Sequence, residues 1–433
     1  MIPVFLSRVL FPARSCTGTA HSIRYLNTYT SVHCPGQSRL TRAPAMLIDI
    51  GANLLDPMYR GIYHGREAAY HPDDLEDVMD RAWASGTCGR RWCISGPCRR
   101  YDPYLWCSCR EQRQCPLDAL ITYLPTRLRW RSGHLRIRRY IACSLTHLTH
   151  FTLPTGVSKI MVTAGTLTEA QRAVAFCREW NTRLGANKLF TTVGVHPTRA
   201  NEWNADPTNY MAGLEQVLQE DADAPGASVV VAIGECGLDY DRLEFCDKDT
   251  QMACFREHFR LAETYKLPMF LHSRASGGDM VEVLRANASA VVNGGVVHSF
   301  DGCTEEMGAL LSIACGEDAL LYIGVNGCSM KTEENLEVIR RVPLARLMVE
   351  TDAPWCGIRP SHASHSYVKK PVGVQKDKKK WEQGCAVKGR NEPGCLGQVV
   401  DVVSGVMGAS FDDVARETTQ NAERVFFVCE DRM

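Results

Sequence analysis

Polar side chains able to bind metals or transfer protons follow one apolar segment after another in this sequence. Segment 229–233 is an unbroken apolar, mostly β-branched run that reaches Gly234, and Glu235 comes next. Such a run predicts a strand buried on both faces, as in a parallel sheet covered by helices. Because an unpaired buried carboxylate costs several kcal/mol, Glu235 is expected to bind a metal, meet a cation or take up a proton. The alternative is a carboxylate that reaches solvent at the strand end.

The same construction recurs at other predicted strand ends. The further candidates are Asp49, Asn53, His196, His272, His298 and Asp352. One histidine at a strand end is more often a satisfied core residue, but imidazoles and carboxylates at the ends of five strands indicate a divalent metal site. A carboxylate such as Glu235 can bridge two ions about 3.5–4 Å apart, the spacing used in phosphoryl hydrolysis.

Eight apolar segments alternate with stretches of helical periodicity. Strands are predicted at 46–50, 157–163, 189–195, 229–233, 267–271, 295–297, 320–325 and 346–349. Helices are predicted at 72–85, 168–184, 210–220, 250–265, 279–286, 303–314 and 335–341, with closing helices at 398–407 and 411–427. Eight βα units favour a (β/α)8 TIM barrel over an open sheet. The carboxyl ends of its strands open on one face, where the candidate residues would meet.

Length and composition are those of a soluble globular protein. Of the 433 residues, 45% are hydrophobic and 23% charged, which is ordinary for this class. One barrel of about 250 residues with additions is a fair alternative to two domains. The formal net charge is zero, so any nucleic-acid site must be a local basic surface. No apolar run approaches the ~20 residues of a membrane span, and we expect neither a membrane contact nor an obligate protein partner.

The twenty cysteines do not resemble a secreted disulfide framework, because the chain is long and has no clear signal peptide. No C-x-x-C pair occurs, and reduced intracellular thiols are the expected state. A cytoplasmic or nuclear location follows. Residues 1–45 contain five arginines and no acid, a composition typical of a mitochondrial transit peptide. A disordered extension and an unused upstream start codon stay open.

The block 87–156 differs from the rest of the chain. It holds twelve arginines, seven cysteines, three acids and no lysine, without sustained periodicity. Since a helix and the next strand are normally joined by a few residues, this block is interpreted as an insertion in a βα unit. Its cysteine spacing fits no common zinc pattern. We hypothesise that it is translated intron sequence, which a cDNA running from Gly86 to Val157 would support.

Basic residues near the predicted strand ends suit a phosphate-bearing substrate. Arg199, Arg242 and Arg274 lie just beyond candidate site residues, and guanidinium groups match phosphate oxygens. Surface ion pairs are the alternative. A lysine-rich run from Lys369 to Arg390 is a candidate surface for backbone contact and base stacking. Within it the substrate-binding candidates are Lys378, Lys380 and Trp381.

Several motifs carry a resemblance to a known family. They are V-G-V-H-P-T-R, G-E-C-G-L-D-Y-D-R, L-P-M-F-L-H-S-R, V-V-H-S-F-D-G, Y-I-G-V-N-G-C-S-M-K-T and E-T-D-A-P-W-C-G. Together they resemble the TatD family of metal-dependent deoxyribonucleases, within the amidohydrolase-like barrels. The segments I-D-I-G-A-N-L-L-D-P-M-Y-R-G-I-Y, K-K-K-W-E and R-N-E-P are similar to its eukaryotic branch. The resemblance covers 46–86 and 157–428.

The resemblance implies a hydrolase barrel over 46–428 that cleaves DNA phosphodiester bonds from a 3′ end. It implies one or two divalent cations per chain, Mg²⁺ first, with Mn²⁺ or Zn²⁺ as alternatives. Glu235 matches the bridging ligand, and His272, His298 and Asp352 match the remaining ligands. Asp352 could also orient the attacking water as a base. His196 matches a histidine that assists catalysis.

This chain departs from the family in its first strand. Many relatives carry an H-x-H pair there, where this sequence has Asp49 and Asn53. Occupancy of the more exposed metal position therefore stays open. Two other functions also remain: a metal-dependent amidohydrolase or deacylase on the same barrel, and a catalytically damaged protein that binds nucleic acid with steep salt dependence.

Overall fold

Strands and helices alternate along the parts of the chain that the computed structural model describes, residues 46–84, 156–315, 319–369 and 373–427. The predicted N-terminal extension and all but the last residue of the predicted insertion lie outside these ranges. The ten cysteines within them are free thiols, as the sequence predicts.

Eight parallel strands form one sheet in the order of the sequence. They are β1 (Leu47–Ala52), β2 (Val157–Val162), β3 (Leu189–Val193), β4 (Val230–Asp239), β5 (Met269–Arg274), β6 (Gly295–His298), β7 (Leu321–Val325) and β8 (Leu347–Val349). The prediction of eight strands is confirmed, but β4 and β5 run beyond their predicted ends. Glu235 and His272 therefore lie inside strands, because the hydrogen-bonded ladder between β4 and β5 continues to Asp239 and Arg274.

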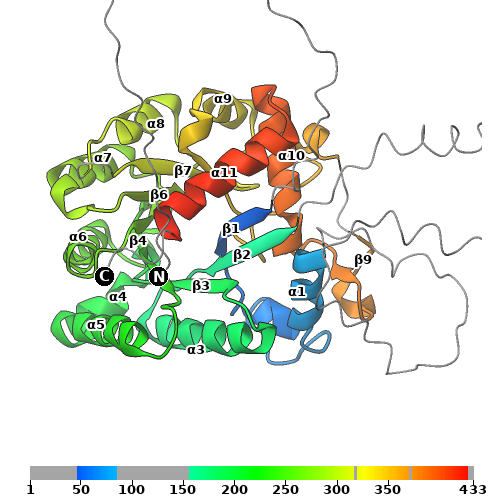
Figure 1. Ribbon diagram of the computed structural model, residues 1–433, viewed down its shortest axis with the longest axis horizontal. Coiled ribbons are helices and arrows are strands. Elements are labelled where there is room, and N and C mark those ends of the chain that lie inside the picture. The colour runs from blue at the N-terminus through cyan, green and yellow to red at the C-terminus, as the bar shows by residue number, and fades with distance from the viewer. Residues whose placement is uncertain (1–45, 85–155, 316–318, 370–372, 428–433) are drawn as a thin grey trace, which may run out of the picture. The chain divides into compact units, whose positions relative to one another are not determined.

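Helices connect these strands and surround the sheet (Figure 1). They are α1 (Leu75–Ala84), α3 (Leu167–Leu184), α4 (Ala200–Ala205), α5 (Pro207–Asp223), α6 (Lys248–Tyr265), α7 (Gly277–Ala286), α8 (Thr304–Leu311), α9 (Glu333–Arg341), α10 (Leu396–Met407) and α11 (Phe411–Phe426). The sequence missed α4, whose six residues are too few to show a helical period. The helix predicted at 303–314 ends at Leu311, where Ile313 N–H turns back to the Leu310 carbonyl.

Short elements lie in the connections. They are the 3-10 helices η1 (Pro57–Arg60), η2 (Pro197–Arg199), η3 (Tyr240–Arg242), η4 (Ala288–Ala290), η5 (Leu344–Arg346), η6 (Ala363–Tyr367), η7 (Lys378–Lys380) and η8 (Pro393–Cys395), and the paired strands β9 (Gln375–Lys376) and β10 (Ala386–Val387). Within the described ranges no single helix is long and apolar enough to cross a membrane; segments 393–407 and 411–426, bent by 113°, reach that length and composition only together.

Backbone hydrogen bonds between β1 and the residues after β8 close the sheet into a barrel. Asp352 N–H donates to the Gly51 carbonyl at 2.7 Å, and Asn53 N–H donates to the Ala353 carbonyl at 2.6 Å. The closure brings the ends of the first and last strands together, so side chains separated by about 300 residues become neighbours at the barrel mouth. For example, Asn53 Nδ2 donates to Asp352 Oδ1 across 299 residues.

Both faces of the strands pack against apolar groups. An outer cluster lies between the strands and the helices, and an inner cluster fills the barrel. The inner cluster includes Ile48, Phe270 and Met348 from the strands and Phe426 from α11. Since Asn421 Nδ2 on α11 donates to the Leu347 carbonyl at the start of β8, α11 covers the amino end of the barrel (Figure 1). Burial on both faces explains why the strands read as continuous apolar runs.

Two glycines allow β4 and β5 to approach closely on either side of Glu235. Gly234 and Gly237 have φ angles of +147° and +144°, which L-residues with a side chain rarely adopt. A Cβ atom at Gly234 would lie 2.2 Å from the Phe270 carbonyl oxygen, and one at Gly237 would lie 2.0 Å from the His272 carbonyl oxygen. The glycines of G-E-C-G thus serve the backbone geometry that presents Glu235.

A buried ion-pair network ties the last loop to α1. Arg390 donates to both Asp74 oxygens at 2.7 and 2.6 Å, and to Glu392 Oε1 at 3.0 Å. Arg81 donates to Glu392 as well, at 2.7 and 2.9 Å. The side chains of Arg390, Asp74 and Glu392 are at most 1% exposed. The sequence analysis included Arg390 in a candidate DNA-contacting surface. This prediction is wrong, because the buried Arg390 guanidinium forms ion pairs with Asp74 and Glu392.

We expect Arg390→Ala to lower the free energy of unfolding by about 3–5 kcal/mol, because it leaves Asp74 and Glu392 buried without their shared cation. Urea denaturation followed by circular dichroism measures the change. The matched control is Lys388→Ala, an exposed neighbour, which should stay within about 0.5 kcal/mol of the wild type. A loss for Arg390→Ala as small as that of the control would contradict the structural role of this network.

Candidate metal centre

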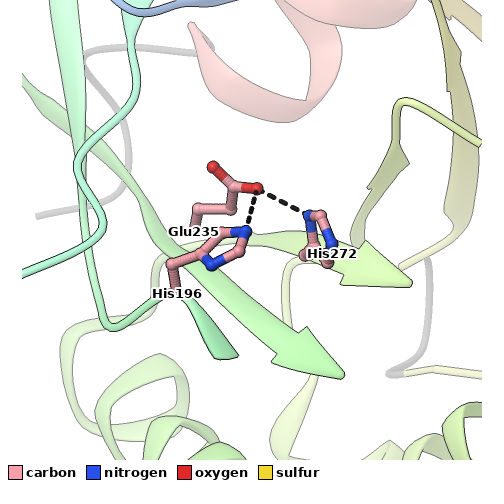
Figure 2. A group of neighbouring side chains, drawn as sticks. All are labelled: His196, Glu235 and His272. Atoms are coloured by element: carbon pink, nitrogen blue, oxygen red, sulfur yellow. Dashed lines mark hydrogen bonds and ion pairs between the residues drawn. The ribbon is translucent and has the colours of Figure 1, made fainter. Parts of the chain in front are cut away.

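One oxygen of Glu235 faces three imidazole rings at the barrel mouth. Glu235 Oε1 lies 2.8 Å from His272 Nδ1, 2.8 Å from His298 Nε2 and 3.4 Å from His196 Nε2. Figure 2 shows His196 and His272 on either side of the Glu235 carboxylate. All these side chains are largely buried. The structure therefore brings together four of the residues that the sequence nominated.

Strand register places these groups side by side. His272 and His298 are direct partners in the parallel pairing of β5 with β6, so both rings project from the same level of the barrel. Their Nδ1 and Nε2 atoms lie 3.3 Å apart. His196 follows β3 by three residues and caps the start of η2, where Pro197 favours the turn. The turn directs the His196 ring back towards His272, with 4.4 Å between ring centroids.

Charge balance dominates this cluster. Burial by itself would raise the pKa of Glu235, but the charge of His298 and hydrogen bonds from His272 and His298 hold that pKa well below its ordinary value. Burial would lower the pKa of His298, and the opposing charges of Glu235 and Glu350 raise it well above the ordinary range. Glu235 is consequently an anion whose charge is matched by neighbouring imidazoles.

His196 differs from the other two histidines in its protonation. Burial lowers the pKa of His196 to about 3, so its ring is neutral at physiological pH. Its Nδ1 accepts the backbone N–H of Thr198 at 3.2 Å. A nitrogen that accepts this bond carries no proton, so in this tautomer the proton sits on Nε2. His196 therefore presents an N–H donor to the centre.

Asp352 lies directly after β8, and both of its oxygens have protein partners. Asn53 Nδ2 donates to Oδ1 at 2.8 Å, and the Cys356 thiol lies 3.1 Å from Oδ2. Burial raises the pKa of Asp352 to about 6, with the His298 imidazole acting in the opposite direction. The carboxylate is thus electrostatically linked to the cluster, and Asn53 orients it.

Two carboxylates that the sequence analysis did not select complete the surroundings of the histidines. Asp239 Oδ2 lies 3.3 Å from His272 Nε2, and Glu350 Oε1 lies 3.3 Å from His298 Nδ1. Both carboxylates are fully buried. His272 and His298 therefore each have Glu235 near one ring nitrogen and a second carboxylate near the other. Glu350 carried the same signal as Glu235, an acid directly after an apolar strand.

Asp49 is placed away from the cluster. Its two oxygens accept the Thr351 N–H at 2.9 Å, the Thr351 hydroxyl at 2.5 Å and the Gly51 N–H at 3.3 Å. It alternates with Ile48 and Ile50, which belong to the inner cluster, so it faces the helices rather than the barrel interior. Burial raises the pKa of Asp49 to about 8. These contacts give Asp49 a part in barrel closure.

The donor set at the barrel mouth fits a divalent cation. Among the described residues, His196, Glu235 and His272 offer ligand atoms that all lie within 4.8 Å of one another. His298 Nε2 approaches the same Glu235 oxygen. His298 Nδ1 has the ion-pair contact with Glu350 Oε1 but no hydrogen bond, and Glu350 Oε2 is buried without a hydrogen-bond partner. Imidazole nitrogen and carboxylate oxygen are the usual ligands of Zn²⁺ and other divalent ions in proteins.

The three candidate arginines end short elements near this centre: Arg199 ends η2, Arg242 ends η3 and Arg274 ends β5. Arg199 is exposed at the end of η2. Arg242 Nε lies 3.8 Å from Asp239 Oδ2, and Arg274 Nε lies 3.7 Å from Asp301 Oδ2. Both distances exceed hydrogen-bonding length. The guanidinium groups of Arg242 and Arg274 therefore lie beside the site without tight ion pairs to these acids.

Two of the three substrate-binding candidates in the lysine-rich segment pack against aromatic rings of the protein. Lys378 Nζ lies over the rings of Tyr63 and Tyr70, 4.7 Å from each centroid. Trp381 stacks on His71 with 5.4 Å between ring centroids, and its Nε1 donates to the Cys385 carbonyl. Lys380 is exposed. Of the three candidates in this segment, Lys380 is the most available for a ligand.

Comparison with known proteins places these features in context. Residues 150–427 match the family of TatD related DNases. The chain is 33% identical to a Schizosaccharomyces pombe protein named deoxyribonuclease Tat-D, over 86% of this chain and 93% of that one. It is 30% identical to an Erwinia amylovora protein named 3′-5′ ssDNA/RNA exonuclease TatD, over 63% of this chain and 89% of that one. A solved TatD-family hydrolase structure from Entamoeba histolytica superposes with a TM-score of 0.65 at 29% identity, covering 89% of this chain and all of that one.

A buried histidine on α6 supports the backbone that leads to His196. His258 Nε2 accepts the Val195 N–H at 3.0 Å, and its Nδ1 donates to the Cys254 carbonyl at 2.9 Å. Burial lowers the pKa of His258 to about 4, so the folded protein holds this ring neutral. The unfolded chain, with an ordinary pKa near 6.5, takes up a proton first as the pH falls.

This difference predicts a pH-dependent contribution to stability, present above pH 6.5 and lost as the pH falls towards 4. Integrated over that window it amounts to about 3 kcal/mol. His258→Gln should be less stable than the wild type at pH 7, and the gap should narrow towards pH 4 because the variant lacks the titrating group. Urea unfolding at several pH values measures this gap. A gap that stays constant with pH would show that His258 does not stay neutral in the fold.

Proposed function

Because the chain belongs to the TatD related DNase family, we propose that it is a divalent-metal-dependent deoxyribonuclease, a hydrolase that cleaves phosphodiester bonds in DNA. The observation that carries this proposal is the Glu235 oxygen surrounded by imidazole nitrogens at 2.8, 2.8 and 3.4 Å. Phosphoryl transfer needs charge stabilisation and positioning more than covalent chemistry, and such a cluster provides both.

We assign the metal ligands as Glu235, His272, His298 and Asp352, with Mg²⁺ as the first candidate cation. A divalent cation held there supplies Lewis-acid polarisation of a phosphoryl oxygen and makes a water molecule more acidic. Asp239 and Glu350 fix the rings of His272 and His298 through their second nitrogens.

The remaining residues act on the substrate and on protons. Asp352 accepts a proton from the attacking water, since burial places its pKa at about 6, close to the operating pH of a general base. His196, neutral with its proton on Nε2, donates a hydrogen bond to the phosphate as negative charge develops. Arg199, Arg242 and Arg274 hold flanking phosphates. These arginines favour a phosphodiester over an amide substrate.

We further propose a 3′–5′ exonuclease. Support comes from the Erwinia amylovora relative, whose name carries that activity, at 30% identity. We also assign the hydrolase barrel to residues 46–428, interrupted by the insertion at 87–156. That boundary is supported by α1 ending at Ala84 and β2 beginning at Val157 beside β1. The cellular compartment stays a prediction from the sequence.

End-labelled DNA tests the proposal directly. Purified protein with Mg²⁺ should release labelled mononucleotide at once from 3′-labelled single strands and produce a descending ladder from 5′-labelled ones, and EDTA should stop both.

Glu235→Gln should lower kcat/KM by more than about 100-fold and weaken Mg²⁺ binding in calorimetry, since it removes the central anion. Glu244→Gln removes the same charge from the exposed loop after β4 and should change neither. Internal cuts from the outset would overturn the exonuclease assignment, and full activity in EDTA would overturn the metal assignment.

Lys380→Ala should raise KM more than it lowers kcat, because an exposed lysine contributes phosphate contact without touching the reacting bond. The slope of log Kd against log salt concentration should fall by about 0.7–1, the share of one phosphate contact. Fluorescence anisotropy on labelled oligonucleotides at several salt concentrations measures this. Arg256→Ala, an exposed cation on α6, is the control. An unchanged salt slope for Lys380→Ala would remove this residue from the substrate surface.

A further inference from the structure

The exposed hydrophobic side chains are unevenly distributed around the barrel. Among the described residues, the large ones are Met46, Leu243, Phe245, Leu320, Trp355 and Val374. Met46 and Leu320 immediately precede β1 and β7, at the amino end of the barrel. Leu243 and Phe245 lie after β4, the strand that carries Glu235, and Trp355 lies after β8, the strand that precedes Asp352. The apolar surface at the mouth is therefore concentrated beside the metal ligands.

Among the described residues, Trp355 is the exposed aromatic residue nearest in sequence to a proposed metal ligand. Its backbone N–H donates to the Asp352 carbonyl at 2.9 Å, so the turn that carries the ligand also carries the ring. The Trp355 side chain interacts with the Asp56 carboxylate and acts to lower its pKa, although burial raises that pKa overall. Asp56 is itself fixed, because its Oδ1 accepts the Met58 N–H at 2.8 Å. The indole therefore has a fixed carboxylate as its polar neighbour.

Despite these contacts, Trp355 is 52% exposed. Single exposed hydrophobic residues are common on protein surfaces and often have no function. Trp355 differs because its backbone is fixed by the turn at Asp352 and its side chain adjoins Asp56, while much of its ring remains open to solvent. A ring that is ordered before binding loses little conformational freedom when a flat ligand stacks on it. This combination is what a stacking platform requires.

The loop across the mouth complements this platform. In a closed eight-stranded barrel β4 lies opposite β8, so Phe245, 58% exposed, stands across the opening from Trp355. Phe245 is held in place by Asn201, whose Nδ2 donates to its carbonyl at 2.7 Å. Arg242 lies on the same loop. A nucleic-acid strand crossing the mouth would meet an aromatic face near Asp352 and then a cation and a second aromatic face beyond Glu235.

We propose that Trp355 is a specificity-determining residue on which the base next to the scissile phosphate stacks. The proposal rests on the proposed function of the same site. Because a base can stack on Trp355 only when its face is free, the residue selects an unpaired end of single-stranded nucleic acid. Every base has a π face, so the selection is for an unpaired base and not for a particular sequence.

The test compares two single-stranded substrates with wild type, Trp355→Ala and Trp355→Phe. One oligonucleotide has ordinary nucleotides at its 3′ end, and the other has abasic residues at its last two positions. Trp355→Ala should lower kcat/KM on the ordinary end by about 5- to 150-fold, mainly through KM, and leave the abasic end unchanged. Trp355→Phe keeps a flat ring and should stay within about threefold of wild type. Leu320→Ala, an exposed hydrophobic residue at the other end of the barrel, should match wild type on both substrates.

The assignment would be overturned if Trp355→Ala lowered kcat/KM equally on the ordinary and the abasic oligonucleotide, or on neither of them. In both cases the effect of Trp355 would not depend on the presence of a base. Binding of both oligonucleotides, measured by anisotropy in EDTA, separates this outcome from failure of the proposed function. If wild type cleaves neither substrate, the nuclease proposal fails. Tighter binding of the ordinary end that is lost in Trp355→Ala would still support the platform, and equal binding of the two ends by wild type would overturn it.

Discussion

The buried carboxylate of Glu235 at the mouth of the barrel stays ionised only if cationic or hydrogen-bonding groups surround it, and the rest of the structure positions those groups. Glu235 lies on β4 with little solvent contact, and burial alone would drive it to take up a proton. The imidazoles of His272 on β5 and His298 on β6 keep it ionised. Each reaches Glu235 only because the parallel strands end at the same rim. The centre therefore depends on strand register and on closure of the sheet between β1 and the residues after β8.

Charge alternation extends outward from Glu235. His272 and His298 each stand between Glu235 and a second buried carboxylate, Asp239 or Glu350. A histidine whose far nitrogen is occupied in this way has its ring orientation fixed, which orients the other nitrogen for a ligand. The arrangement joins five ionisable side chains. Its balance explains how so many buried charges persist in a barrel whose lower interior is apolar.

Charged residues divide into those that hold the fold and those available at the surface. Arg390 lies inside the protein between Asp74 and Glu392, although it belongs to the same basic segment as the exposed Lys380. The sequence gives no sign of which of the two cations is available to a ligand. The structure does, because the buried Arg390 is already paired with carboxylates and cannot bind phosphate, whereas Lys380 is exposed. The aromatic residues divide similarly, with Trp381 packed on His71 and Trp355 open at the mouth.

The sequence by itself determined the eight strands, most of the helices and the residues at their ends, because periodicity and burial patterns are local properties of the chain. It selected His196, His272 and His298 together with Glu235, and in the structure the three imidazole rings surround one Glu235 oxygen. It did not identify Asp239 and Glu350 as partners of the histidines, since a contact across 33 or 52 residues is set by strand register. It also did not separate Asp49, bound to Thr351, from Asn53, bound to Asp352. Those contacts form only when the last strand returns to the first, and that closure was decided by the tertiary structure.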